Sequence, residues 1–152
     1  MRHGKFGKKL LKLYFMKKII ILDNSKFISL KIRSELFKSL SYENKVKLYY
    51  LRDEKKENQI DFISHNFSSQ KLTFLSLANF IFEISKTEKL LTFTIRPLII
   101  SFIIKKIFPN IKLYPTITGT GPLIESKNLI YKFLRILYPI ILSKAKHIFF
   151  HN

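Results

Sequence analysis

The sequence predicts an α/β protein, a single Rossmann-like domain built on a mostly parallel sheet. Apolar runs rich in β-branched residues alternate with longer segments of helical periodicity, at the spacing of βα units. The chain has 152 residues and shows no break in composition, which favours one sizeable core. It contains no cysteine, so disulfides and thiolate chemistry are excluded and a reducing compartment is permitted.

The first half of the chain opens with a strand that should be buried on both faces. Lys18–Leu22 is a continuous β-branched run, and it ends in the turn and N-cap residues Asp23, Asn24 and Ser25. The elements expected after it are a helix at Phe27–Leu40, strands at Val46–Leu51 and Ile60–Ile63, and a helix at Phe67–Ile84.

In the second half, the strand Leu90–Ile95 is stopped by proline, which cannot join a central ladder. Pro97 suits the first turn of the next helix. The remaining expected elements are helices at Leu98–Phe108 and Lys127–Leu142 and strands at Ile111–Thr118 and Lys146–Phe150. Pro139 should kink the last helix or end it near Tyr138.

Glycine is scarce, and two of only four glycines stand close together, at Gly119 and Gly121. Glycine tolerates positive φ and lets a ligand approach the backbone closely. A strand, a glycine-containing turn and a helix form a geometry that binds phosphates and sugars in α/β sheets. The loop Thr118–Gly121, which includes Thr120, is therefore a candidate binding site. The loop after the first strand lacks the three glycines of a dinucleotide fingerprint, which argues against nucleotide binding there.

Two of the five arginines are further candidates. Arg33 falls about two turns into the first helix, where it could point at a ligand above the sheet. The residues alone favour the alternative, a solvent-exposed helix face. Thr94 and Arg96 stand at the carboxyl end of a strand, where open α/β sheets bind ligands, although a capped strand end with a surface arginine would give the same pattern. The residues identify no catalytic group and no metal site.

The net charge of +18 indicates an anionic partner: nucleic acid, an acidic membrane surface or a phosphorylated substrate. Lysine supplies most of it, so drift of composition on solvated faces is the plain alternative. The last predicted helix carries a broad apolar arc beside Lys127, Lys132 and Arg135. That pattern is typical of core packing, with contact to anionic lipid as the second interpretation. No apolar run approaches the ~20 residues of a spanning helix. Residues 1–15 are expected to be a basic leader outside a fold of residues 16–152.

Several segments, taken in order, resemble family 4 glycosyltransferases. They are Lys-Ile-Ile-Ile-Leu, the Asn-Ser loop leading to Arg33, Thr-Phe-Thr-Ile-Arg-Pro, Ile-Thr-Gly-Thr-Gly and Ala-Lys-His-Ile-Phe-Phe-His-Asn. Within that family the similarity is to bacterial enzymes that extend lipid-linked sugars, and it covers roughly residues 17 to 152. Lys31-Ile32 departs from the Asn-Phe that relatives often carry, and Pro139 interrupts a helix that relatives continue.

The resemblance implies the N-terminal, acceptor-binding half of a GT-B fold, in which two Rossmann-like domains face a cleft and metal is not generally required. It places in the cleft Asn24, Ser25, Arg33, Thr94, Arg96, Thr118, Gly119, Thr120 and Gly121. The nucleotide-sugar donor would bind a C-terminal domain that this sequence lacks. We therefore expect a truncated or split half-enzyme that binds no cofactor itself, is inactive alone and works with a separately encoded donor domain.

The partners that the resemblance implies are an anionic membrane surface and a glycan acceptor linked to polyprenyl diphosphate. The location would be cytoplasmic, peripheral on the inner face of the cytoplasmic membrane. The alternative from another class is a basic nucleic-acid-binding module, with aromatic residues stacking on bases. Against it, we expect the aromatic residues mostly in buried strands and helix faces, and the sequence has no helix-turn-helix, zinc or RNP-like signature.

Overall fold

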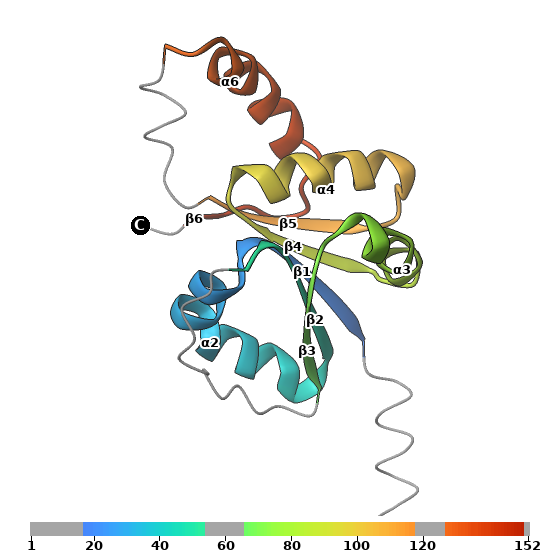
Figure 1. The fold of residues 1–152 in the computed structure, drawn as a ribbon. Helices are drawn as coiled ribbons and strands as arrows, with labels where there is room; N and C mark the ends of the chain where they lie inside the picture. The colour runs from blue at the N-terminus through green and yellow to red at the C-terminus, as the bar shows by residue number, and fades with distance from the viewer. Residues whose placement is uncertain (1–16, 54–65, 118–126, 151–152) are drawn as a thin grey trace, which may run out of the picture.

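The computed structural model of the chain describes residues 17–53, 66–117 and 127–150 (Figure 1). These residues form a six-stranded sheet in the order β3-β2-β1-β4-β5-β6, in which every neighbouring pair is parallel. Four helices accompany the sheet in the described part of the chain. The predicted α/β, Rossmann-like architecture is confirmed.

β1 (Lys18–Ser25) lies at the centre of the sheet, between β2 (Lys45–Arg52) and β4 (Lys89–Phe93). Its apolar residues from Ile19 to Leu22 are at most 2% exposed, as the continuous β-branched run predicted. α2 (Lys26–Glu43) follows without a loop, because Ser25 serves as its N-cap: the Ser25 hydroxyl accepts a hydrogen bond from the Ile28 amide at 3.2 Å.

The third strand differs from the prediction. β3 (Phe67–Lys71) lies in a segment that was assigned to a helix, and α3 (Phe74–Ser85) begins only after it. Thr73 caps α3 in a capping box with Ser76, a signal that the sequence contained. β3 is an edge strand with polar, largely exposed residues, so it lacks the apolar alternation on which strand prediction relies. The expected strand at Ile60–Ile63 lies outside the described residues.

The second half follows the prediction closely. α4 (Ile95–Ile107) carries Pro97 in its first turn, and β5 (Lys112–Ile117) pairs with β4. α6 (Leu129–Leu142) ends at Leu142 as predicted, and it continues past Pro139. Of the two effects expected of this proline, a kink or an end near Tyr138, the second is therefore wrong. The Pro139 carbonyl accepts the Ser143 amide at 2.9 Å. β6 is confined to Phe149–Phe150 and is shorter than expected.

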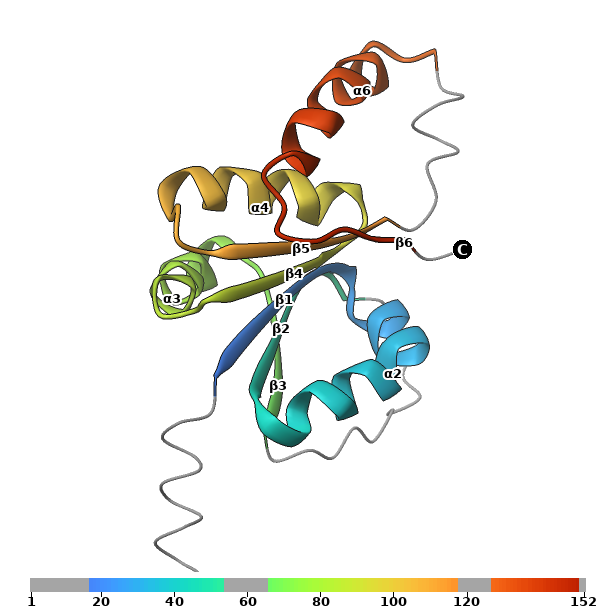
Figure 2. The same cartoon turned by 180° about the vertical axis from the view of Figure 1, so that it is seen from behind.

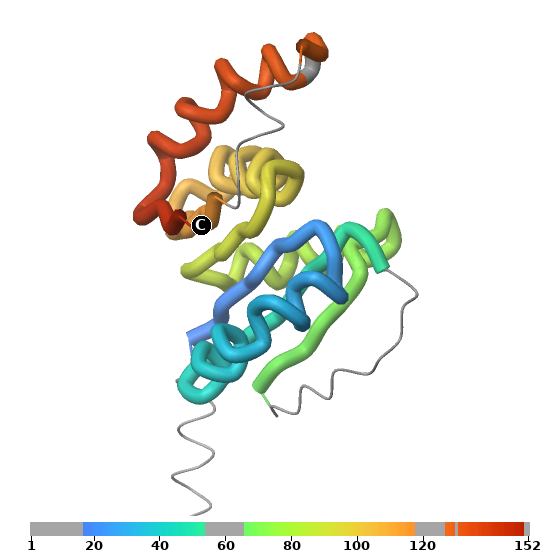
Figure 3. Tube along the Cα trace, turned by 90° about the vertical axis from the view of Figure 1, so that its left-hand side faces the viewer, coloured from blue at the N-terminus to red at the C-terminus, as the bar shows by residue number. Residues whose placement is uncertain are grey.

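The helices form two layers, one on each face of the sheet (Figures 1 and 2). α2 covers one face, over a cluster that includes Ile19, Ile21, Phe37 and Leu48. α3, α4 and α6 cover the other, over a larger cluster that includes Ile20, Leu22, Tyr49, Phe80, Leu90, Phe102, Leu113 and Ile141. α6 lies beyond α4, on the outside of this second layer (Figure 3).

Most aromatic side chains in the described ranges are buried or partly buried, as expected, but several are exposed. The exposed ones are Tyr42, Phe74, Phe82, Phe133, Phe149 and Phe150. Much of this exposed aromatic surface belongs to α3 and α6, the helices of the second layer. In the described ranges no helix combines the length and the apolar character needed to cross a bilayer.

Candidate functional site

The candidate site lies at the carboxyl ends of β1 and β4. The chain runs outward from β1 through β2 to β3, and in the opposite direction from β4 through β5 to β6. Parallel α/β sheets bind ligands where the strand order reverses in this way. Leu22 of β1 pairs with Thr92 of β4, and Asn24 and Thr94 each follow two residues later, at the same end of the sheet. Two predicted site residues from separate motifs therefore lie at the same end of neighbouring strands.

Beneath this position, Asp23 and Arg33 form a buried ion pair. Asp23 is the acidic residue of β1, lies near the carboxyl end of that strand and is 2% exposed. Its Oδ2 accepts hydrogen bonds from Arg33 Nη1 at 2.8 Å and from the Ser29 hydroxyl, and its Oδ1 accepts from the Asn24 amide at 2.7 Å. With these donors in place, the carboxylate is a structural anchor, not a free base.

Arg33 also contacts the neighbouring strand. Its guanidinium carbon lies 4.3 Å from the centre of the Phe93 ring, a cation–π distance. One side chain therefore joins the end of β1, through Asp23, to the end of β4, through Phe93. The solvent-exposed position that the residues alone favoured for Arg33 is wrong, because the residue is 8% exposed.

A bend in α2 turns Arg33 toward the sheet. The residue has φ −119° and ψ 16°, which are not helical values, and α2 consists of two helical segments joined at this point (Figure 1). An unbroken helix would keep its i→i−4 hydrogen bonds, so the bend costs free energy that the buried ion pair helps to offset.

The electrostatics of the pair are set mainly by burial. Removal from water raises the pKa of the Asp23 carboxyl, while the Ser29 hydrogen bond, the charge of Arg33 and the Asn24 amide oppose that rise. Burial lowers the pKa of the Arg33 guanidinium, and the charge of Asp23 raises it. Each group stabilises the charged form of the other where water is excluded.

Thr94 has a strained backbone. It is the only non-glycine residue with positive φ in the described part of the chain, at φ 71° and ψ 165°. This conformation is nearly restricted to glycine, and it costs on the order of 1–3 kcal/mol for other residues. A β-branched residue keeps this conformation only where the surrounding structure enforces it, as β4 and α4 do here. Such positions cluster at ligand sites.

Three buried oxygens at these strand ends have no hydrogen-bond partner among the described residues. They are Asn24 Oδ1, Thr92 Oγ1 and Thr94 Oγ1. An unmade hydrogen bond on a buried polar atom costs roughly 1–3 kcal/mol, so native structures leave few of them. A bound molecule rich in hydroxyl groups could supply the missing donors.

The other predicted site residues are placed differently. Ser25 is buried and its hydroxyl is used in capping α2. Arg96 is exposed in the first turn of α4. Thr118, Gly119, Thr120 and Gly121 lie outside the described residues, directly after the end of β5 at Ile117. Their role stays a prediction.

Three further contributors, Asp23, Ser29 and Thr92, were not among the predicted site residues. Asp23 and Thr92 stand at the ends of two predicted strands, and this position was a usable signal for both. Nothing in the pattern identified Ser29, because its role depends on the start of α2. In the ranges that the structure covers, no group of three or more His, Cys, Asp or Glu side chains could hold a metal ion.

A scan against models of known protein families found no match to this chain, and a search of curated proteins found none either.

Proposed function

We propose that this chain forms the acceptor-binding side of a glycosyltransferase that moves a sugar from a nucleotide sugar to a lipid-linked glycan. The observation that carries the proposal concerns two buried side-chain oxygens, on Asn24 and Thr94, that have no hydrogen-bond partner among the described residues. They lie at the carboxyl ends of β1 and β4, where the strand order reverses. Sugar hydroxyls donate and accept hydrogen bonds, so they suit both side chains. The ordered segments that resemble family 4 glycosyltransferases support the same function.

In this proposal, Arg96 contacts the diphosphate of the acceptor. Arg96 is exposed in the first turn of α4, where the partial positive charge of the helix N-terminus also favours an anion. Its planar guanidinium can bind two phosphate oxygens at once. In this proposal, the nucleotide-sugar donor binds a domain other than the one described.

A polyprenyl-diphosphate acceptor lies in a membrane, so the protein would work at a membrane surface, on the cytoplasmic side. The outer face of α6 supports this part of the proposal. It exposes an apolar stripe of Leu129, Phe133, Ile136 and Ile140. Lys132 and Arg135 are exposed on the same helix, and the chain as a whole carries a charge of +18. Apolar groups that enter the lipid and cations that face anionic headgroups are the two features of an interfacial helix.

Acceptor binding tests the proposal directly. The probe is a farnesyl-diphosphate-linked hexosamine, titrated into the chain by calorimetry. Thr94→Val and Asn24→Ala each remove one of the oxygens that would bind the sugar, and each should weaken binding by about tenfold. Thr87→Val is the matched control, because Thr87 makes its hydrogen bond to the Glu83 carbonyl at the other end of the sheet.

A second variant separates binding from folding. Thr94→Gly removes the same hydroxyl but also relieves the positive-φ strain, so it should bind the probe weakly while unfolding at a temperature no lower than the wild type. The proposal fails if the wild-type chain does not bind the probe. It also fails if the sugar-linked probe binds Asn24→Ala and Thr94→Val as tightly as it binds the wild type.

A further inference from the structure

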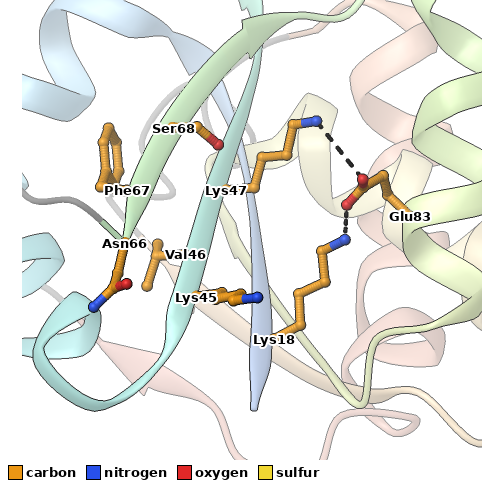
Figure 4. A pocket seen from close by; sticks show the side chains of 8 residues that line it. All are labelled: Lys18, Lys45, Val46, Lys47, Asn66, Phe67, Ser68 and Glu83. Carbon is orange, nitrogen blue, oxygen red and sulfur yellow. Dashed lines mark ion pairs between the residues drawn. The ribbon is translucent and has the colours of Figure 1, made fainter. Parts of the chain in front are cut away.

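We propose a second binding site, for a phosphate group, at the opposite end of the sheet. We call it the lysine pocket: Lys18, Lys45 and Lys47 on the amino-terminal parts of β1 and β2, facing Glu83 of α3 (Figure 4). It does not depend on the glycosyltransferase proposal, because that site lies where β1 and β4 end.

The strand register places the three lysines together. Lys18 of β1 is paired with Lys45 of β2, and Lys47 lies two residues further along β2, on the same face of the sheet. Like charges directly opposite each other on neighbouring strands destabilise a sheet. The apolar residues that follow fix the register, so Lys18 and Lys45 stay opposite each other. Their repulsion persists unless an opposite charge neutralises it.

Among the described residues that line the pocket, one carboxylate faces Lys18 and Lys47. Glu83 makes an ion pair with Lys18, and its Oε1 lies 4.0 Å from Lys47 Nζ. Figure 4 shows Lys18 and Lys47 both reaching toward Glu83 from neighbouring strands. Since one carboxylate carries a single negative charge, the pocket keeps an excess of positive charge.

This excess charge is partly removed from water. The side chains of Lys18 and Lys47 are 26% and 19% exposed, which is low for lysine. Burial lowers the pKa of Lys18, and the charges of Lys47, Lys86 and Lys45 lower it further; burial also lowers the pKa of Lys47. A partly dehydrated cluster of like charges is stabilised by any anion that binds between them.

The shape and the chemistry of the pocket favour a phosphate group over a carboxylate. The pocket has a volume of about 310 Å³ and is open on one side, so an anion can enter from solvent. Ser68 of β3 adds a hydroxyl to its lining. A phosphate dianion can bridge two or three ammonium groups, and lysine binds phosphate as a compact point charge. A carboxylate ligand carries one negative charge, so together with Glu83 it would still leave one of the three lysine charges unneutralised.

The test compares anions at constant ionic strength, because screening alone would affect all of them alike. Inorganic phosphate, glycerol phosphate and acetate are titrated into the chain, and binding is followed by calorimetry. Phosphate and glycerol phosphate should bind more tightly than acetate. A preference for glycerol phosphate would identify a phosphate ester as the natural source of the group, and a preference for inorganic phosphate would identify the free ion.

Two substitutions in the pocket should act in opposite directions. Lys47→Gln removes a cation and should weaken phosphate binding by about tenfold, whereas Glu83→Gln removes the competing carboxylate and should strengthen it several-fold. Lys38→Gln is the matched control, since Lys38 is paired with Glu35 on α2, which covers the other face. If Lys47→Gln fails to fold, the more exposed Lys45→Gln replaces it.

Equal affinity of the wild type and all variants for phosphate would overturn the proposal, since binding would then reflect the overall charge of the chain. A wild-type chain that binds phosphate no better than acetate would overturn it as well.

Discussion

At the scale of single residues, Arg33 is the side chain on which the candidate site depends most. It donates a hydrogen bond to Asp23 at the end of β1 and lies over the Phe93 ring at the end of β4, so it supports the strand ends that carry Asn24 and Thr94. Its positive charge is neutralised inside the protein by Asp23. We therefore expect Arg33 to act on a ligand indirectly, by fixing the two strand ends.

Replacing Arg33 with methionine should destabilise the protein strongly. The change leaves the Asp23 carboxylate buried without a cation, which typically costs about 3–5 kcal/mol of unfolding free energy. Arg96→Met is the matched control, and because Arg96 is exposed it should change stability by less than about 0.5 kcal/mol. Urea unfolding of both variants measures the difference.

The pH dependence of Arg33→Met has a defined sign. Burial already raises the pKa of Asp23, and loss of the guanidinium raises it further. An acid whose pKa is higher in the folded than in the unfolded state stabilises the fold below its unfolded pKa of about 3.9, and this stabilisation is lost as pH rises through the folded pKa. The deficit of the variant relative to the wild type should therefore grow from about pH 4 to neutral pH. A deficit that does not change with pH would contradict the charged state assigned to Asp23.

At the scale of elements, most of the fold could be predicted from the sequence. β1, β2, β4 and β5 are apolar, central or nearly so, and their runs of Ile, Leu, Val and Tyr marked them clearly. β3 was missed because an edge strand needs only half of its surface covered, and its Ser-Ser-Gln core carries no apolar pattern.

The candidate site was anticipated only at strand ends. The position of Thr94 followed from the end of an apolar run, whereas Asn24 entered through the family resemblance. The ion pair of Asp23 with Arg33 needs the bend in α2, and helical periodicity gives no sign of a bend. The strain at Thr94 was equally invisible, because the sequence places threonine where the backbone suits glycine.

α6 has two apolar stripes, and they should respond differently to substitution. Leu137, Tyr138 and Ile141 pack against the body of the protein, whereas Phe133 and Ile136 are exposed. The double substitution of Phe133 and Ile136 by serine should reduce binding to anionic vesicles at least tenfold, because each apolar side chain contributes about 1.5–3 kcal/mol when it leaves water. The unfolding temperature should stay unchanged.

Co-sedimentation with vesicles at two salt concentrations measures this binding, and it should weaken as salt screens the basic side chains. Ile141→Ala is the contrasting variant: Ile141 is 1% exposed, so the change should cost about 2–4 kcal/mol of stability and leave the lipid-binding surface intact. Equal binding of the wild type to neutral and anionic vesicles would argue against a membrane role for α6.

At the scale of the whole molecule, the sheet has one seam, between β1 and β4. The strands on one side of it come from the first half of the described chain, and those on the other side from the second half. The apolar clusters on the two faces both cross this seam, since Ile20 and Ile21 of β1 pack with Leu90 and Leu91 of β4. The candidate site is therefore formed where the two halves of the chain meet.

The position of β1 also predicts an order of folding. Ile19 pairs with Val46 on one side and with the more distant Lys89 on the other, so closing the loop to β2 costs less conformational entropy than closing the loop to β4. During synthesis, β2 also leaves the ribosome before β4. In refolding followed by pulsed hydrogen exchange, the amides of β2 should become protected before those of β4. Simultaneous protection of both strands would contradict this order.

Until β4 arrives, one edge of β1, with its apolar run from Ile19 to Leu22, has no partner, and open edges of this kind pair with other chains. The strand at the centre of the finished sheet is thus exposed to aggregation during synthesis.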